Sequence, residues 1–483
     1  MRRWTLPAVA LAVVLVIPAG VAAHPDDDLP VDTHAARDAA RDATAASHPE
    51  SPDEHSENMR LIGSLPYERG SDLAFWGKTA IAGVYGNSPT SNPGGFRLID
   101  ISDPADPTQI GRFECHGPQS DVSIWQDLAF VSVDSPRAGH SCSTEDTAAG
   151  SAFEGIRIVN IEDPAEPSQI TTVNTDCGSH THTLLPDLAH ENDAGERDPR
   201  LLIYVQSYPL GAPTASCNVV SHRKISVVEV PLNHPEDAQV VSTPSVSPAI
   251  GCHDVTVFPT KDLAAAACIT ESQTWDISDP ENPVILSHIY NPLINIHHST
   301  TFDFEAETLV IGDELGGAAA SPGCLSGGQL PTGSLWFYDV TNPAAPVEQG
   351  FFTLPQNEEP TDICTAHNFN TIPLRNDRDI LVSAWYSGGT TVVDYTDPTN
   401  PEQIGFYEPE ANEATGQQEA EYWSNYWYNG SIYGNNFFSN RGFEVLKLEE
   451  RDILRAEQRV PFLNPQTQLP PPGRRQGAAS ARR

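Results

Sequence analysis

The sequence predicts an all-β fold, a seven-bladed β-propeller closed by an N-terminal strand that completes the last blade. Three observations predict it. A strand-and-turn motif, first seen at residues 96–107 as FRLIDISDPADP, returns along the chain. Seven segments have the pattern of an innermost blade strand, and one segment near the N-terminus matches the outermost strands of the other repeats. Repetition of one unit is typical of solenoids and propellers.

The motif combines a strand with a tight turn. Each copy is a run of β-branched or aromatic residues that ends in Asp-Pro or Asn-Pro, where proline fixes φ and removes a backbone donor. Further copies lie at residues 156–167, 272–283, 335–346 and 390–401, with a degenerate copy at 225–230. We therefore expect a strand and a turn at each of these positions.

One repeat contains four short strands, at residues 120–125, 128–133, 156–161 and 169–173. Four short strands per repeat are typical of a propeller blade. By the same template the innermost strands begin near Ser71, Ser120, His180, His253, His297, His367 and Tyr422. The sequence therefore predicts seven blades.

The last blade lacks a turn that would lead to a fourth strand. Residues 59–65 resemble the fourth strands at 109–113 and 403–407. We expect the N-terminal segment to complete this blade, because ring closure removes an unpaired sheet edge. Residues 59–450 then form one domain.

The two ends of the chain have different compositions. Residues 1–23 are typical of a signal peptide, with an Arg pair before an apolar run and small residues at the end. We expect residues 24–58 to be a disordered acidic linker and residues 451–483 a largely disordered C-terminal extension. No later segment reaches the ~20 apolar residues of a membrane span. The prediction is a secreted, extracellular protein, with cell-surface association left open.

The charge of the chain excludes several partners. It has 65 acidic and 27 basic residues and a net charge of -38, which repels nucleic acid and anionic lipid. It has no glycine-rich phosphate loop, so we expect no nucleotide cofactor. The remaining expectation is a monomer whose partner is an unidentified small molecule or surface ligand.

Eight cysteines in an exported chain without a Cys-x-x-Cys pattern predict disulfides rather than a metal cluster. All eight fall near the end of the blades where the innermost strands begin. Proximity favours the pairs Cys115 with Cys142, Cys177 with Cys217, Cys252 with Cys268, and Cys324 with Cys364. Other pairings stay open at this point.

Histidines mark four consecutive innermost strands. His180, His253, His297 and His367 stand where each strand begins, a position that converges on one mouth of a propeller channel. Four imidazoles there could bind a transition metal, with iron or copper favoured and zinc a further candidate.

Four nearby residues could support such a site. His182 or His298 could replace one of the four ligands, and Glu271 and Glu314 could accept hydrogen bonds that fix the histidine tautomers. Two other interpretations stay open, namely histidines that only join adjacent blades and a ligand site without metal.

The repeats resemble the LVIVD-repeat family of exported bacterial propellers, although residues 230–235 and the last blade depart from the pattern. The resemblance implies residence outside the cytoplasm and no settled chemistry. The histidine arrangement is similar to that of carotenoid-cleavage oxygenases, propellers whose four histidines hold iron. One hypothesis is therefore a metal-dependent oxidoreductase with no catalytic residue yet identified. The other is a non-enzymatic binding or adhesion module that uses the long loops at residues 89–95, 135–154, 209–224 and 316–333.

Overall fold

The structure is a computed structural model. It describes residues 54–470 except for 68, 87–93, 116, 143–152, 193, 209–216, 218–220, 315–332, 356–362, 410, 413–416, 419–420 and 438–440. The expected signal peptide and most of the expected linker lie outside the described residues. No helix in the described part has the length and apolar character to span a bilayer.

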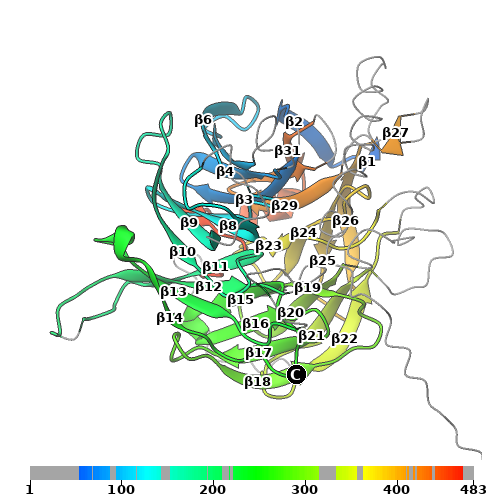
Figure 1. Cartoon of the computed structure of the whole chain (residues 1–483). Helices are drawn as coiled ribbons and strands as arrows, with labels where there is room; N and C mark the ends of the chain where they lie inside the picture. The colour runs from blue at the N-terminus through cyan, green and yellow to red at the C-terminus, as the bar shows by residue number, and fades with distance from the viewer. Residues whose placement is uncertain are drawn as a thin grey trace, which may run out of the picture.

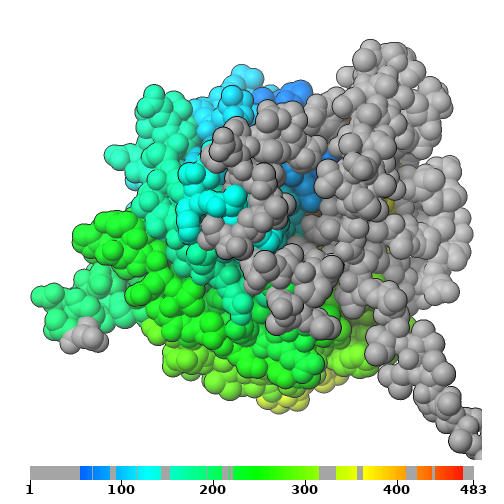
Figure 2. Space-filling model, in the orientation of Figure 1, coloured from blue at the N-terminus to red at the C-terminus, as the bar shows by residue number. Residues whose placement is uncertain are grey.

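Seven antiparallel sheets surround a central channel in chain order, which confirms the predicted seven-bladed propeller (Figure 1). In the space-filling view, blue, cyan and green follow one another around this face (Figure 2). The strands of each blade are given from the innermost to the outermost. Blade one is β3 (Gly70–Trp76), β4 (Thr79–Val84), β5 (Gly95–Asp100) and β6 (Thr108–Glu114), and blade two is β7 (Val122–Trp125), β8 (Leu128–Arg137), β9 (Phe153–Asn160) and β10 (Ser168–Asn174). Blade three is β11 (Thr181–Asp187), β12 (Arg200–Gln206), β13 (Ser226–Pro231) and β14 (Gln239–Ser242).

Blades four to seven continue the ring. Blade four is β15 (Asp254–Phe258), β16 (Leu263–Ala267), β17 (Ser272–Asp276) and β18 (Val284–Ile289), and blade five is β19 (His297–Phe302), β20 (Thr308–Asp313), β21 (Leu335–Asp339) and β22 (Val347–Phe352). Blade six is β23 (Phe369–Thr371), β24 (Ile380–Ala384), β25 (Thr390–Asp394) and β26 (Glu402–Glu408). Blade seven is β29 (Tyr422–Tyr428), β30 (Ser431–Asn436), β31 (Phe443–Leu448) and β2 (Met59–Leu65). Outside this pattern lie β1 (Glu54–His55), η1 (Pro235–Asp237), η2 (Pro259–Lys261), β27 (Ala411–Asn412), β28 (Gln417–Gln418), α3 (Arg451–Ala456) and β32 (Phe462–Leu463).

The ring closes as predicted. β2 pairs antiparallel with β31, from Met59 opposite Leu448 to Leu65 opposite Phe443, so the blue N-terminal strand lies beside the orange last blade (Figure 1). β1 also pairs with β26 at the outer edge of blade six. The end of the expected linker is therefore part of the sheet structure.

The repeated motif is explained by two successive turns. Asp100 accepts a hydrogen bond from the backbone N–H of Ser102 at 2.8 Å, and Asp103 accepts one from the N–H of Ala105 at 3.0 Å. The hydrogen bonds from Ser102 also hold the pKa of Asp100 below its usual value. A short side chain that bonds the backbone two residues ahead stabilises such turns, which is why the motif carries Asp or Asn at both places.

Glycines in the outer strands let adjacent blades approach closely. A Cβ atom on Gly111 would lie 1.5 Å from the carbonyl oxygen of Pro164, in the turn of the next blade. Likewise, a Cβ atom on Gly350 would lie 2.6 Å from the carbonyl oxygen of Pro398, and one on Gly63 would lie 2.4 Å from that of Pro104. The turns at Pro104, Pro164 and Pro398 thus also serve as contacts between blades.

Three of the expected disulfides are confirmed. They join Cys115 to Cys142, Cys177 to Cys217, and Cys252 to Cys268. Cys364 is also disulfide-bonded, and Cys324, its expected partner, lies outside the described residues.

The C-terminal segment differs from the prediction of a largely disordered extension. Residues 457–470, here called the strap, lie against the channel ends of the innermost strands, where β32 pairs with Phe75 and Trp76 of β3. Farther along, Gln468 bonds the backbone N–H and carbonyl of Phe302 at 2.7 and 2.8 Å. The innermost strands expose unpaired backbone groups toward the channel, and the strap satisfies them. Its order comes from these partners rather than from its own sequence pattern.

Candidate metal centre

Three of the predicted histidines occupy equivalent places in blades three, four and six of the ring. The backbone N–H groups of His180, His253 and His367 each donate to a carbonyl at the end of the second strand of the same blade, at 2.9, 2.8 and 3.0 Å. All three side chains are buried. The blade geometry therefore directs these imidazoles to one mouth of the channel.

In blade five the structure differs from the prediction. A β-bulge lies between His297 and Ser299, and an extra residue in a strand redirects the side chains around it. The Nδ1 atom of His297 contacts the Ser272 hydroxyl in blade four at 2.8 Å, and burial lowers the pKa of His297 to about 3. His298 instead takes its place beside His253 and His367.

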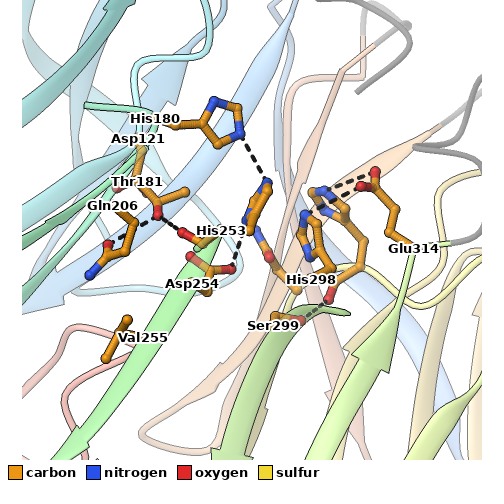
Figure 3. A network of polar contacts seen from close by, with 12 residues as sticks. Asp121, His180, Thr181, Gln206, His253, Asp254, Val255, His298, Ser299 and Glu314 are labelled. Atoms are coloured by element: carbon orange, nitrogen blue, oxygen red, sulfur yellow. Dashed lines mark hydrogen bonds and ion pairs between the residues drawn. The ribbon is translucent and has the colours of Figure 1, made fainter. Parts of the chain in front are cut away.

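Four imidazoles form a continuous row, as Figure 3 shows in part. Ring centroids are separated by 4.5 Å from His180 to His253, 3.8 Å from His253 to His298, and 4.4 Å from His298 to His367. The Nε2 atoms of His180 and His253 are 2.9 Å apart. Four residues far apart in the sequence thus meet at one place.

Neighbouring acceptors favour one tautomer at two imidazoles of the row. Nδ1 of His180 lies 3.3 Å from a carboxylate oxygen of Asp134, and Nδ1 of His253 lies 3.5 Å from Asp254. Nδ1 of His367 bonds the carbonyl oxygen of Trp423. Since an ionised carboxylate and a carbonyl only accept hydrogen bonds, the contacts with Asp134 and Trp423 favour a proton on Nδ1 and a lone pair on Nε2 of His180 and His367. Burial raises the pKa of Asp254 well above its usual value, so its contact does not select a tautomer of His253.

The Nε2 contact between His180 and His253 can form in two ways. With a proton on Nε2 of His253 it is an ordinary N–H···N hydrogen bond, and with lone pairs on both atoms it needs a metal ion between them. The spacing suits two adjacent ligands that each lie about 2.1 Å from one metal.

A carboxylate completes the other end of the row. Glu314, directly after β20, places its two oxygens 3.6 Å from Nε2 of His298 and 3.7 Å from Nε2 of His367 (Figure 3). The Tyr386 hydroxyl donates a hydrogen bond of 2.7 Å to Glu314 and fixes its orientation. The ligand atoms of His298, Glu314 and His367 lie within 4.8 Å of one another. Two imidazoles and one carboxylate with open positions are typical of non-haem iron sites.

Two other residues singled out from the sequence lie elsewhere. Ring nitrogens of His182 contact Ser123 at 2.6 Å and the carboxylate of Asp121 at 3.0 Å, which joins blade three to blade two. Glu271 contacts His288 at 2.8 Å. Neither has a contact with the row among the interactions of the described residues.

An acidic layer that the sequence analysis missed lies beside the row. Asp72, Asp121 and Asp254 line a hollow of about 10 Å³ together with His253 and His367, which is room for about one water molecule. Burial, followed by the neighbouring carboxylates, raises the pKa of Asp72 and of Asp254 well above its usual value. An Asp directly after the predicted start of the innermost strand in three blades, at Ser71, Ser120 and His253, was the sequence pattern that could have revealed it.

Comparison with known proteins supports the fold. The LVIVD repeat family matches residues 91–115. Hydrazine synthase of Kuenenia stuttgartiensis is 11% identical over 83% of this chain and 98% of its own, with a TM-score of 0.49. Raptor of Chaetomium thermophilum is 11% identical over 82% of this chain and 30% of its own, with a TM-score of 0.50. No curated protein matches the sequence. At 11% identity, the likeness to Raptor indicates a shared fold alone.

Proposed function

The chain is a seven-bladed propeller of the LVIVD-repeat family, and from this premise we propose that the histidine-lined mouth of its channel binds a transition-metal ion. His298, Glu314 and His367 supply the ligands, and His253 and His180 extend the set. The observation that carries the proposal is the convergence of ligand atoms of His298, Glu314 and His367 within 4.8 Å of one another, next to the 2.9 Å approach of Nε2 of His180 to Nε2 of His253.

The ligand types favour iron among the candidate metals. Two imidazoles with one carboxylate match the ligand set of ferrous oxygenases, whereas the absence of thiolate ligands in the set disfavours sites that select Cu(I). Zinc and Cu(II) remain alternatives that direct metal analysis distinguishes.

The proposed activity is redox chemistry on a small substrate. The adjoining hollow has room for about one water molecule, so a reactant at the metal is limited to a molecule of that size unless neighbouring segments move. Anaerobic iron-loaded protein should bind nitric oxide and give a new electron paramagnetic resonance signal. If the loaded metal gives no such adduct, its coordination is closed and the redox proposal fails.

Metal analysis tests the binding proposal. Full-length protein purified without an affinity tag should contain about one equivalent of metal, and His253→Ala and His367→Ala should each lower this content at least tenfold. His234→Ala is the matched control, because His234 has a side chain that is 68% exposed and lies away from the row. A folded wild-type protein that takes up none of iron, copper or zinc would refute the proposal and favour the non-enzymatic module.

The third part of the proposal is export. Three disulfides in the described residues are typical of an oxidising compartment. N-terminal sequencing of protein recovered from the medium should begin at His24. Recovery of the full chain from the cytoplasm with free thiols would contradict this assignment.

A further inference from the structure

The strap makes one circuit around the end of the channel opposite the histidine row. It begins at blade six, where Glu457 bridges to Leu374, and passes blade seven, where Val460 bonds the side chain of Asn429. It then meets blade one through β32 and blade two through Asn464. The circuit continues to blades three and four through Thr467, and to blade five through Gln468.

The circuit borders a partly open cavity of about 240 Å³. Its walls come from the innermost strands of blades five to seven and from the strap, and include Phe304, Trp427, Phe462, Leu463 and Leu469. A cavity of roughly 150 Å³ lined by apolar side chains is large enough to bind benzene. This larger cavity therefore has room for a two-ring molecule.

One polar group in the wall is available to a ligand. Thr301 is 1% exposed, and its hydroxyl has no hydrogen-bond partner in the part of the chain that the structure describes. The other polar groups nearby are engaged, since Thr371 bonds the carbonyl of Phe302 and Asn370 bonds the backbone of Trp427. A buried hydroxyl without a partner is unfavourable, and a ligand with one hydrogen-bonding group would satisfy it.

We propose that this cavity is a binding site for a small, uncharged, aromatic or alicyclic molecule with a single hydrogen-bonding group, held by Thr301 and contacted by the strap. No ionisable side chain is among the described residues of its wall, so charged ligands would lose hydration without compensation. Apolar walls with few polar groups are typical of small-molecule sites. The site is separate from the proposed metal centre, at the far end of the innermost strands.

Calorimetric titration of the full chain with 2-naphthol tests the proposal. We expect saturable binding of one equivalent, weakened roughly fivefold by Thr301→Val because one hydrogen bond is lost. Naphthalene lacks the hydroxyl and should bind the wild type and this variant equally. Leu469→Trp fills the cavity and should abolish binding of both probes. Leu188→Trp, at a residue 40% exposed elsewhere, is the matched control and should retain it.

Three outcomes would overturn the proposal. They are no heat of binding at about 1 mM probe, unchanged binding in Leu469→Trp, and binding by a chain that ends at Pro470 but not by the full chain. The last result would assign the cavity to residues 471–483. Binding should be unchanged in His367→Ala, so failure of the metal centre and failure of this site are distinguishable.

Discussion

Replacement of Asn464 by alanine tests whether the strap is held by its side-chain hydrogen bonds. Asn464 is 2% exposed and forms two bonds of 2.9 Å, one with the backbone N–H and one with the carbonyl oxygen of Ile124. Ile124 is itself 1% exposed. Removal of the amide leaves a buried donor and a buried acceptor unsatisfied, at about 1–3 kcal/mol each.

We expect the free energy that protects the Ile124 amide to fall by about 2–4 kcal/mol in Asn464→Ala. The loss cannot exceed the free energy that holds the strap in place, because release of the strap would let water bind the polar groups of Ile124. Hydrogen exchange at the Ile124 amide should therefore accelerate roughly 30- to 1,000-fold. Gln466→Ala is the control, since Gln466 accepts a bond from Val257 through its backbone carbonyl and should stay within about 0.5 kcal/mol of wild type. Unchanged protection of the Ile124 amide in Asn464→Ala would refute the reasoning.

Three further predictions concern the blades, the row and pH. Gly111→Ala should lower the free energy of unfolding by about 3 kcal/mol, since its Cβ would meet a backbone oxygen at 1.5 Å, whereas Gly77→Ala, with open space and φ of +59°, should lose about 1 kcal/mol in the same urea titration. His298→Ala should abolish metal uptake, whereas His297→Ala should retain it; equal loss would contradict the bulge assignment. Burial raises the pKa of Asp303 from 3.8 to about 7, so folding retains a proton that the unfolded chain releases. Stability should then decline from about pH 4 to about pH 7, and Asp303→Asn should flatten this decline; an unchanged slope would contradict it.

The candidate site was only partly predictable. Sequence position indicated the shared place of His180, His253 and His367, because each follows the same connection into an innermost strand. The choice between His297 and His298 depended on a bulge in blade five. Two adjacent histidines in a strand point to opposite faces, and nothing local to the sequence indicates which face a bulge will select.

The sequence by itself determined the blade number and the ring closure, since these follow from repeated local patterns of strands and turns. It favoured three of the disulfide pairs through the positions of their cysteines in the blades, and the structure selected them. The tertiary structure decided the orientation of the imidazoles, the acidic layer beside them and the path of the strap. Those features depend on groups from different blades that meet only after the ring closes. Residues 457–470 have no periodic pattern of their own, and they are ordered by hydrogen bonds to strand edges that exist only in the folded propeller.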